Sequence, residues 1–118
     1  MQIQIIEINN QQIAEVISDK IIFENAQDAV DLLGNLYFQG INKVILYEKN
    51  IAKDFFDLKT KLAGEILQKF SNYRVRLIIV GNFENIKGKS LNDFIFESNN
   101  GRQVNFLKSR EEAIERIS

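Results

Sequence analysis

The chain has 118 residues, of which 45% are hydrophobic and 26% are charged, and its 15 basic and 16 acidic residues leave a formal net charge of -1. This composition is typical of one globular domain with a buried core, and it excludes intrinsic disorder. The near balance of charges provides no bulk attraction to nucleic acid or to an anionic membrane, so neither is expected as a partner. We expect residues 1–118 to form a single domain.

The sequence contains no cysteine and no histidine. Thiol nucleophiles, serine–histidine relays and soft-metal sites are therefore excluded, and we predict no catalytic residue, no metal site and no cofactor. The first residues, Met1–Gln4, form no charged leader with an apolar core, and no apolar run approaches the roughly 20 residues of a membrane span. We expect a soluble, cytoplasmic protein.

The start of the chain has the pattern of a β-hairpin. Ile3, Ile5 and Ile8 alternate with polar residues, Asn9-Asn10 interrupts the alternation, and residues 13–17 resume a β-rich run. Alternation that stops at a short polar turn and then resumes favours two antiparallel strands.

Four helices are predicted from one shared start signal. In each case a residue that can cap a helix is followed three positions later by an acid, which satisfies free amide groups and favours the positive end of the helix dipole. The four pairs are Asn25 with Asp28, Asp54 with Asp57, Ser90 with Asp93, and Ser109 with Glu112.

Three further strands are predicted between these helices, at residues 43–47, 75–80 and 103–107. Gly40 and Gly101 stand where a helix would end in a left-handed residue. The predicted order is β-β-α-β-α-β-α-β-α, so the fold class is α/β with a mixed five-stranded sheet and an N-terminal hairpin.

Three segments carry a resemblance to a known family. Residues 55–74, together with Leu32-Leu33-Gly34-Asn35 before them and residues 89–95 after them, are similar to a bacterial family of short proteins described only as a domain of unknown function (DUF4180). The resemblance covers most of the chain. It implies no assigned activity.

The order of elements is more distantly similar to that of STAS domains, the family of anti-sigma-factor antagonists. In that family a Ser or Thr at the start of the helix after the third strand is phosphorylated, which switches partner binding. Here Asp57-Leu58-Lys59-Thr60 holds that place, without the Asp-Ser-Ser/Thr-Gly character of the family. The resemblance implies a STAS-like fold and a regulatory role, and it leaves Thr60 either as a phosphate acceptor or as an ordinary helix residue.

The second predicted helix carries two further patterns. Asp57, Lys61, Glu65 and Lys69 alternate in charge at intervals of four, which is typical of a solvated face or of a surface that selects a partner by charge. A glycine inside a helix lowers helix stability by about 1 kcal/mol relative to Ala. The presence of Gly64 therefore indicates a packing reason, such as the close approach of a neighbour. That neighbour is another helix of the same domain, or a helix of a second copy in a homodimer.

The preferred function is a non-catalytic regulatory or protein-interaction module. Its predicted partner surface consists of Asp57, Lys59 and Thr60 at the start of the second helix. Glu48, Lys89 and Ser90 are predicted to form its rim. The missing catalytic chemistry and the resemblance to STAS domains both favour this interpretation.

The alternative is a small-ligand or anion-binding protein, or an enzyme, that uses a crevice at the carboxyl ends of the parallel strands. Ligands of open α/β sheets usually bind there. The candidate residues are Glu48, Asn82, Lys89 and Ser90, and the loop 87–90 offers lysines and backbone amides to an anion. It lacks the first glycine and the spacing of a nucleotide-binding loop.

Overall fold

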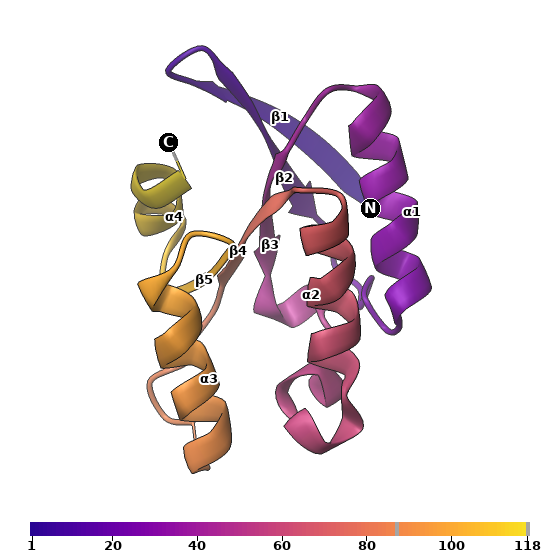
Figure 1. The fold of residues 1–118 in the computed structure, drawn as a ribbon. Coiled ribbons are helices and arrows are strands. Elements are labelled where there is room, and N and C mark those ends of the chain that lie inside the picture. Colours follow the sequence, from indigo (N-terminus) through magenta and orange to yellow (C-terminus); the bar gives the residue numbers. More distant parts are fainter. Residues whose placement is uncertain (87, 118) are drawn as a thin grey trace.

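The computed structural model describes residues 1–86 and 88–117, and it contains one five-stranded sheet with the strand order β1-β2-β3-β4-β5 (Figure 1). β1 and β2 are antiparallel, and the other neighbours are parallel, so the predicted α/β fold with its mixed sheet and hairpin is confirmed. Three short 3-10 helices lie between β3 and α2: η1 (Glu48–Asn50), η2 (Lys53–Phe56) and η3 (Leu58–Thr60). The other elements are β1 (Gln2–Ile8), β2 (Gln11–Ile17), α1 (Ala26–Phe38), β3 (Lys43–Tyr47), α2 (Leu62–Asn72), β4 (Arg76–Val80), α3 (Lys89–Asn100), β5 (Val104–Leu107) and α4 (Arg110–Ile117).

The hairpin turns at Asn9 and Asn10, whose φ angles are 52° and 66°. Asparagine tolerates this left-handed conformation, and a two-residue turn of this kind matches the twist of the strands it joins. Ile8 pairs with Gln11, and the register continues to Gln2 opposite Ile17. The predicted hairpin is confirmed.

The helices cover the two faces of the sheet unequally. The parallel strands β2 to β5 follow one another in chain order, so crossovers of one hand place α1, α2 and α3 on the same face. α4 follows the last strand and packs on the opposite face with only eight residues (Figure 1). Within the described part of the chain, no helix is long and apolar enough to cross a membrane.

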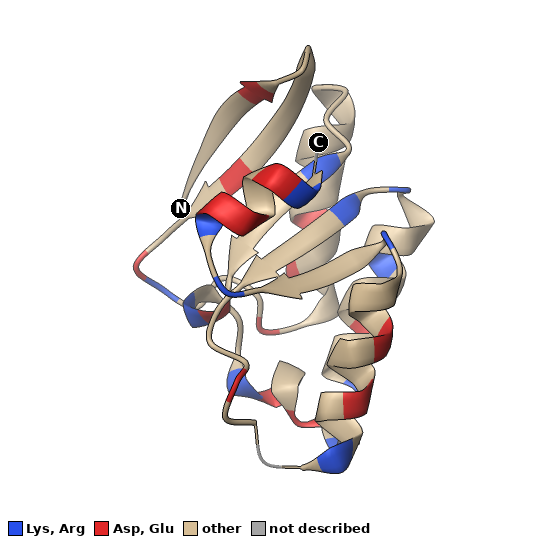
Figure 2. Ribbon diagram, turned by 90° about the vertical axis from the view of Figure 1, so that its left-hand side faces the viewer, with Lys and Arg blue, Asp and Glu red and all other residues tan. Residues whose placement is uncertain are grey.

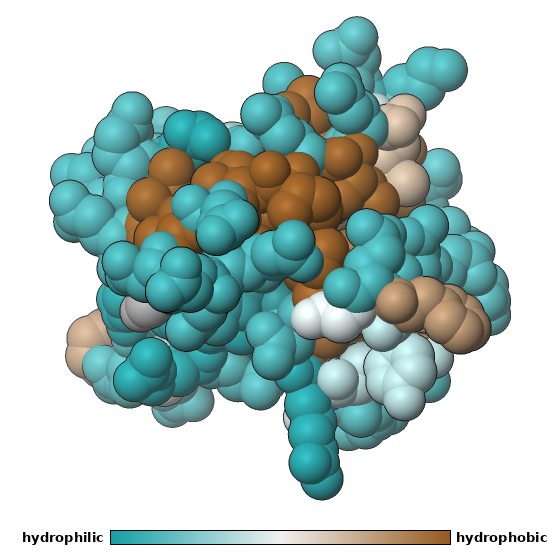
Figure 3. All heavy atoms as spheres, turned by 90° about the horizontal axis from the view of Figure 1, so that it is seen from above, coloured by the Kyte–Doolittle hydropathy of each residue, from teal (hydrophilic) through white to brown (hydrophobic). Residues whose placement is uncertain are grey.

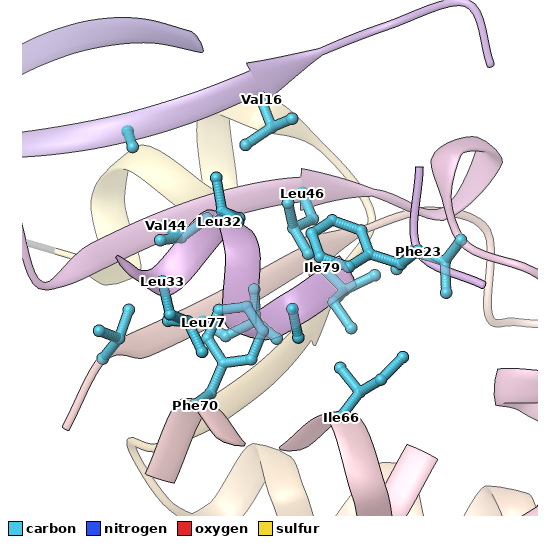
Figure 4. Close-up of a cluster of buried hydrophobic side chains, with 14 of the residues drawn as sticks. Val16, Phe23, Leu32, Leu33, Val44, Leu46, Ile66, Phe70, Leu77 and Ile79 are labelled. Carbon is cyan, nitrogen blue, oxygen red and sulfur yellow. The ribbon is translucent and has the colours of Figure 1, made fainter. Parts of the chain in front are cut away.

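The main core lies between the sheet and the helices α1 and α2 (Figure 4). Alternate strand residues point into it, because successive side chains of a strand face opposite sides. A smaller core on the other face joins Ile13, Ile45 and Ile78 of the sheet to Ala113 and Ile117 of α4. The labelled members of the main core are Val16, Phe23, Leu32, Leu33, Val44, Leu46, Ile66, Phe70, Leu77 and Ile79.

Two of the predicted helix starts are confirmed by their capping hydrogen bonds. The Asn25 side chain accepts a hydrogen bond from the Asp28 amide at 3.0 Å, and the Ser109 hydroxyl accepts one from the Glu112 amide at 3.2 Å. Gly40, with φ at 71°, follows α1 in the predicted left-handed conformation.

The predicted start of the second helix is wrong. Asp54 and Asp57 lie in and beside 3-10 helices, and α2 begins only at Leu62. Lys61 has a φ of 67°, and this left-handed residue separates η3 from the right-handed α2. The predicted charge ladder therefore does not exist, because Asp57 and Lys61 stand outside the helix that holds its other two members, Glu65 and Lys69.

Three smaller expectations also differ from the structure. Ser90 is the second residue of α3, which begins at Lys89 after Gly88 with φ at 121°, so Ser90 is not the cap. Gly101 is extended, with φ at -101° and ψ at -167°. Apart from its chain neighbours and the backbone of its own helix, no described heavy atom lies within 4 Å of a Cβ built on Gly64, so no other helix of the same domain approaches it closely. Lys87 of the loop 87–90 lies outside the described residues.

Candidate functional site

A buried carboxylate joins three elements on the face of the sheet that α4 covers. Glu15 of β2 is only 3% exposed. The Tyr47 hydroxyl donates to Oε2 of Glu15, and Arg110 donates to the same oxygen from Nε at 2.9 Å and to Oε1 from Nη2 at 3.3 Å. The fork of the guanidinium matches the carboxylate, so both carboxylate oxygens accept hydrogen bonds.

The pKa values in this cluster follow from burial and from these bonds. Burial alone raises the pKa of Glu15, but the hydrogen bonds from Arg110 and Tyr47, with the charge of Arg110, outweigh burial and lower it. Burial first, and then the hydrogen bond and charge of Glu15, raise the pKa of Tyr47 to about 12. The hydrogen bond to Glu15, followed by its charge, raises the pKa of Arg110. Near neutral pH Glu15 is therefore charged and Tyr47 is a neutral donor.

This cluster fixes α4 to the sheet, since it links residues that are 95 positions apart in the chain. All three side chains are engaged with one another, so the geometry is that of an internal ion pair. This ion pair was not predicted from the sequence. The available signal was an acid inside an apolar strand, in Ile13-Ala14-Glu15-Val16, because a buried charge requires a partner.

The predicted partner surface lies in the 3-10 segment that precedes α2. Asp57, Lys59 and Thr60 are all exposed. The Asp57 carboxylate accepts a hydrogen bond from the Lys59 amide at 3.2 Å. The Thr60 hydroxyl lies 2.6 Å from the Asp54 carbonyl oxygen and accepts from the Leu62 amide at 3.3 Å. This hydroxyl therefore helps to begin α2, while the Lys59 side chain is open to solvent.

Two residues of the predicted crevice meet at the carboxyl ends of β3 and β4. Oε1 of Glu48 accepts a hydrogen bond from the Asn82 amide at 3.0 Å. A Cβ at Gly81 would lie 2.6 Å from the Glu48 Cβ, so only glycine allows this close approach. The side chain of Glu48 therefore fills the space above the end of β4.

The other two crevice residues lie on the first turn of α3. Lys89 forms an ion pair with Asp93 of the same helix at 2.6 Å, and Ser90 is exposed. A hollow of about 350 Å³ lies near the end of β5, and its lining includes none of Glu48, Asn82, Lys89 and Ser90. That hollow is lined by Phe83, Glu84, Ile95, Asn99, Phe106, Leu107, Lys108 and Glu112.

Basic residues gather at the opposite end of the sheet, around the C-terminal end of α4 (Figure 2). We call Lys43, Arg76, Arg102 and Arg116 the basic cluster. Lys43 and Arg76 donate to the Ile117 carbonyl at 2.9 Å and 3.2 Å, as suits the negative end of a helix dipole. Burial and then neighbouring cations of the cluster lower the pKa values of Lys43 and Arg76.

Aromatic side chains are exposed where α1 and α2 end. Phe38, the last residue of α1, is 90% exposed, and Tyr37 beside it is 70% exposed. Their rings meet edge to face at 6.1 Å. Together with Gly34, Asn72, Tyr73 and Arg74 they line a hollow of about 510 Å³, which we call the aromatic surface. The buried stripe of α1, at residues 29, 32, 33 and 36, turns Tyr37 and Phe38 away from the core.

Among residues 1–86 and 88–117, no three acidic side chains gather closely enough to hold a metal ion. The model of the family described as "Domain of unknown function (DUF4180)" matches residues 8–117. Neither a curated protein nor a solved structure matches the chain.

Proposed function

The chain belongs to the DUF4180 family, and we propose that this member is a non-catalytic protein-interaction module that binds its partner through the aromatic surface. The single observation that carries the proposal is the exposure of Tyr37 and Phe38 around a hollow of about 510 Å³. Aromatic and arginine side chains contribute most of the binding energy in many interfaces, and this surface combines both types.

The cost of this exposure supports the proposal. Burying a phenylalanine side chain contributes about 1.5–3 kcal/mol, which Phe38 does not gain in the isolated chain. Single exposed apolar residues are common, but here two adjacent rings and Tyr73 share one hollow with Arg74. A partner that covers this hollow would gain the burial that the fold itself leaves unused.

The polar surface of Asp57, Lys59 and Thr60 is proposed as a second contact region. It precedes α2, whereas Asn72, Tyr73 and Arg74 of the aromatic surface lie at the other end of that helix, about 16 Å away along its 11 residues. A regulatory role like that of STAS domains would involve this region. Its exposure and the free Lys59 side chain are compatible with partner contact.

The test is affinity capture with the tagged chain from an extract of the source cells. We expect a specific partner with the wild type, loss of that partner with Phe38→Ser, and retention with Phe96→Ser. Phe96 is a matched control because it is also an exposed phenylalanine, at 68%, but lies on α3. Lys59→Glu measures the contribution of the second region.

Retention of the partner by Phe38→Ser would contradict the assignment of the aromatic surface. Failure of the wild type to capture any specific partner would contradict the interaction function itself. Circular dichroism of each variant excludes unfolding as the cause of a loss.

A second candidate function, anion binding, is favoured by the basic cluster rather than by the crevice at the carboxyl ends of the strands. No ion pair between described residues involves Lys43, Arg76, Arg102 or Arg116. Burial, and after it repulsion among these cations, lowers the pKa values of Lys43 and Arg76, and an anion bound there would relieve the repulsion. We expect inorganic phosphate to raise the melting temperature of the wild type, and Arg102→Gln to weaken this effect more than Arg74→Gln does.

A further inference from the structure

The outer side of β1 carries backbone groups that pair with nothing in the sheet. β1 is the first strand of the order, with β2 on its inner side only. The two-residue turn makes Ile8 and Gln11 a hydrogen-bonded pair, so every second residue back from Ile8 bonds to β2. The residues between them, Ile3, Ile5 and Glu7, direct their N–H and C=O groups away from the sheet.

The other edge of the sheet is closed by a side chain. The Asn99 amide of α3 accepts a hydrogen bond from the Phe106 N–H at 2.7 Å and donates one to the Phe106 C=O at 3.1 Å. It therefore provides Phe106 with both hydrogen bonds that a further strand would form with this residue. β5 is also short, with four residues, whereas β1 has seven.

β1 lacks the features that usually protect an exposed edge. It contains no proline and no lysine, and Glu7 is its only charged residue. Ile5 is 41% exposed. In the view from above, hydrophobic residues form a band across the surface of the molecule (Figure 3). A long, apolar and unpaired edge strand is a template for pairing with another strand.

We propose that β1 pairs antiparallel with β1 of a second copy of this chain, so that two sheets join into one across a two-fold axis near Gln4. In this register Ile3 lies opposite Ile5 of the second copy, and the two Glu7 carboxylates lie at opposite ends of the pairing. Apolar residues then face apolar residues on one side and no like charges face each other, which is the complementarity that a strand needs to pair with itself.

A hollow beside β1 supports this register. It has a volume of about 420 Å³, and Met1, Ile3, Ile22 and Leu32 contribute to its apolar lining. Ile5 of the second copy, placed opposite Ile3, would lie next to this hollow on the same face of the sheet. The proposed dimer interface does not include the aromatic surface, so the dimer and the proposed function can be tested independently of each other.

Sedimentation equilibrium over a range of concentrations tests the proposal. We expect the wild type to dimerise reversibly, Ile5→Lys to raise the dissociation constant by about tenfold or more, and Phe38→Ser to leave it unchanged. A wild type that stays monomeric at every concentration would overturn the proposal. So would a dimer that survives Ile5→Lys and is lost with Phe38→Ser.

Cysteine cross-linking tests the same pairing without altering its apolar residues, and the absence of natural cysteine makes each variant unambiguous. We expect mild oxidation to link Gln4→Cys into a covalent dimer, since residues opposite each other on the axis are close enough for a disulfide. Glu7→Cys is the control, because the proposed register separates its two copies by about 20 Å. Equal cross-linking of both variants, or of neither, would refute the register.

Discussion

The two edges of the sheet differ in how their backbone groups are treated. At β5 the Asn99 amide bonds to both the N–H and the C=O of Phe106, so the ladder ends on a side chain of the same molecule. At β1 the outward groups of Ile3, Ile5 and Glu7 have no such partner in the sheet. One well-placed amide is therefore sufficient to close an edge of this sheet, and only one of the two edges is closed in this way.

The ion pair between Glu15 and Arg110 holds β2, the strand next to the open edge, in place. Removing this ion pair should have the largest effect on stability. Glu15→Ala leaves Arg110 and Tyr47 of the cluster without their acceptor, and we expect the free energy of unfolding to fall by about 2–3 kcal/mol. The loss is not larger because the Arg110 side chain is 45% exposed and can turn to water. Urea denaturation measures the change. Glu7→Ala on exposed β1 is the control, and an equal loss for both variants would show that the ion pair does not anchor β2.

Opening the closed edge should have the next largest effect. Asn99→Ala removes two hydrogen bonds to Phe106, and we expect a loss of about 1–2 kcal/mol in the free energy of unfolding, together with faster exchange of the Phe106 amide hydrogen. The neighbouring Asn100, which is exposed, supplies the control variant Asn100→Ala, with an expected change below about 0.5 kcal/mol. Unchanged exchange at Phe106 would mean that this edge is protected by something other than Asn99.

Lowering the pH should weaken the Glu15 ion pair that holds β2 in place. The folded-state pKa of Glu15 is below its ordinary value of 4.5, so its contribution to stability is complete above that pH and is lost as pH falls through the folded-state pKa. We expect wild-type stability to decrease more steeply below about pH 4.5 than that of Glu15→Gln. Urea midpoints measured in acid and at neutral pH provide the comparison, and parallel slopes would be evidence against a lowered pKa.

The smallest effect on the folded monomer is expected at the open edge. Ile5→Lys changes an exposed side chain whose backbone groups do not bond to β2, so the unfolding free energy measured at low protein concentration should change by less than about 0.5 kcal/mol. Thermal melting at two protein concentrations separates this effect from any effect on association. A large loss in the monomer would show that Ile5 packs within its own domain.

The helix starts illustrate how far local sequence signals reach. Asn25 and Ser109 were predicted as caps and both accept the expected amide, because a capping bond spans only three residues. Asp54 and Asp57 carry the same signal, yet α2 starts eight residues after Asp54, at Leu62. Phe55 is 1% exposed in this segment, and the left-handed Lys61 separates the 3-10 turns from the helix.

Local sequence signals predict the candidate sites less well than they predict the helix starts. The exposure of Asp57, Lys59 and Thr60 agrees with a surface region, but their role stays a prediction. The aromatic surface was not predicted from the sequence, because Tyr37 and Phe38 reach Tyr73 and Arg74 only when α1 and α2 end side by side. No local pattern connects the ends of two helices.

Hydrophobic periodicity and turn residues act over a few neighbouring positions, so the order of strands and helices and the α/β class could be predicted from the sequence. The family was recognised from the resemblance of residues 55–74 and their flanking segments, and the family model matches residues 8–117. The contact between Glu15 and Arg110, which lies 95 positions further along the chain, arises only in the folded molecule. The same is true of the closure of one sheet edge by Asn99, while β1 stays open at the other. These features depend on which segments pack together, and packing is a property of the whole chain that no single segment encodes.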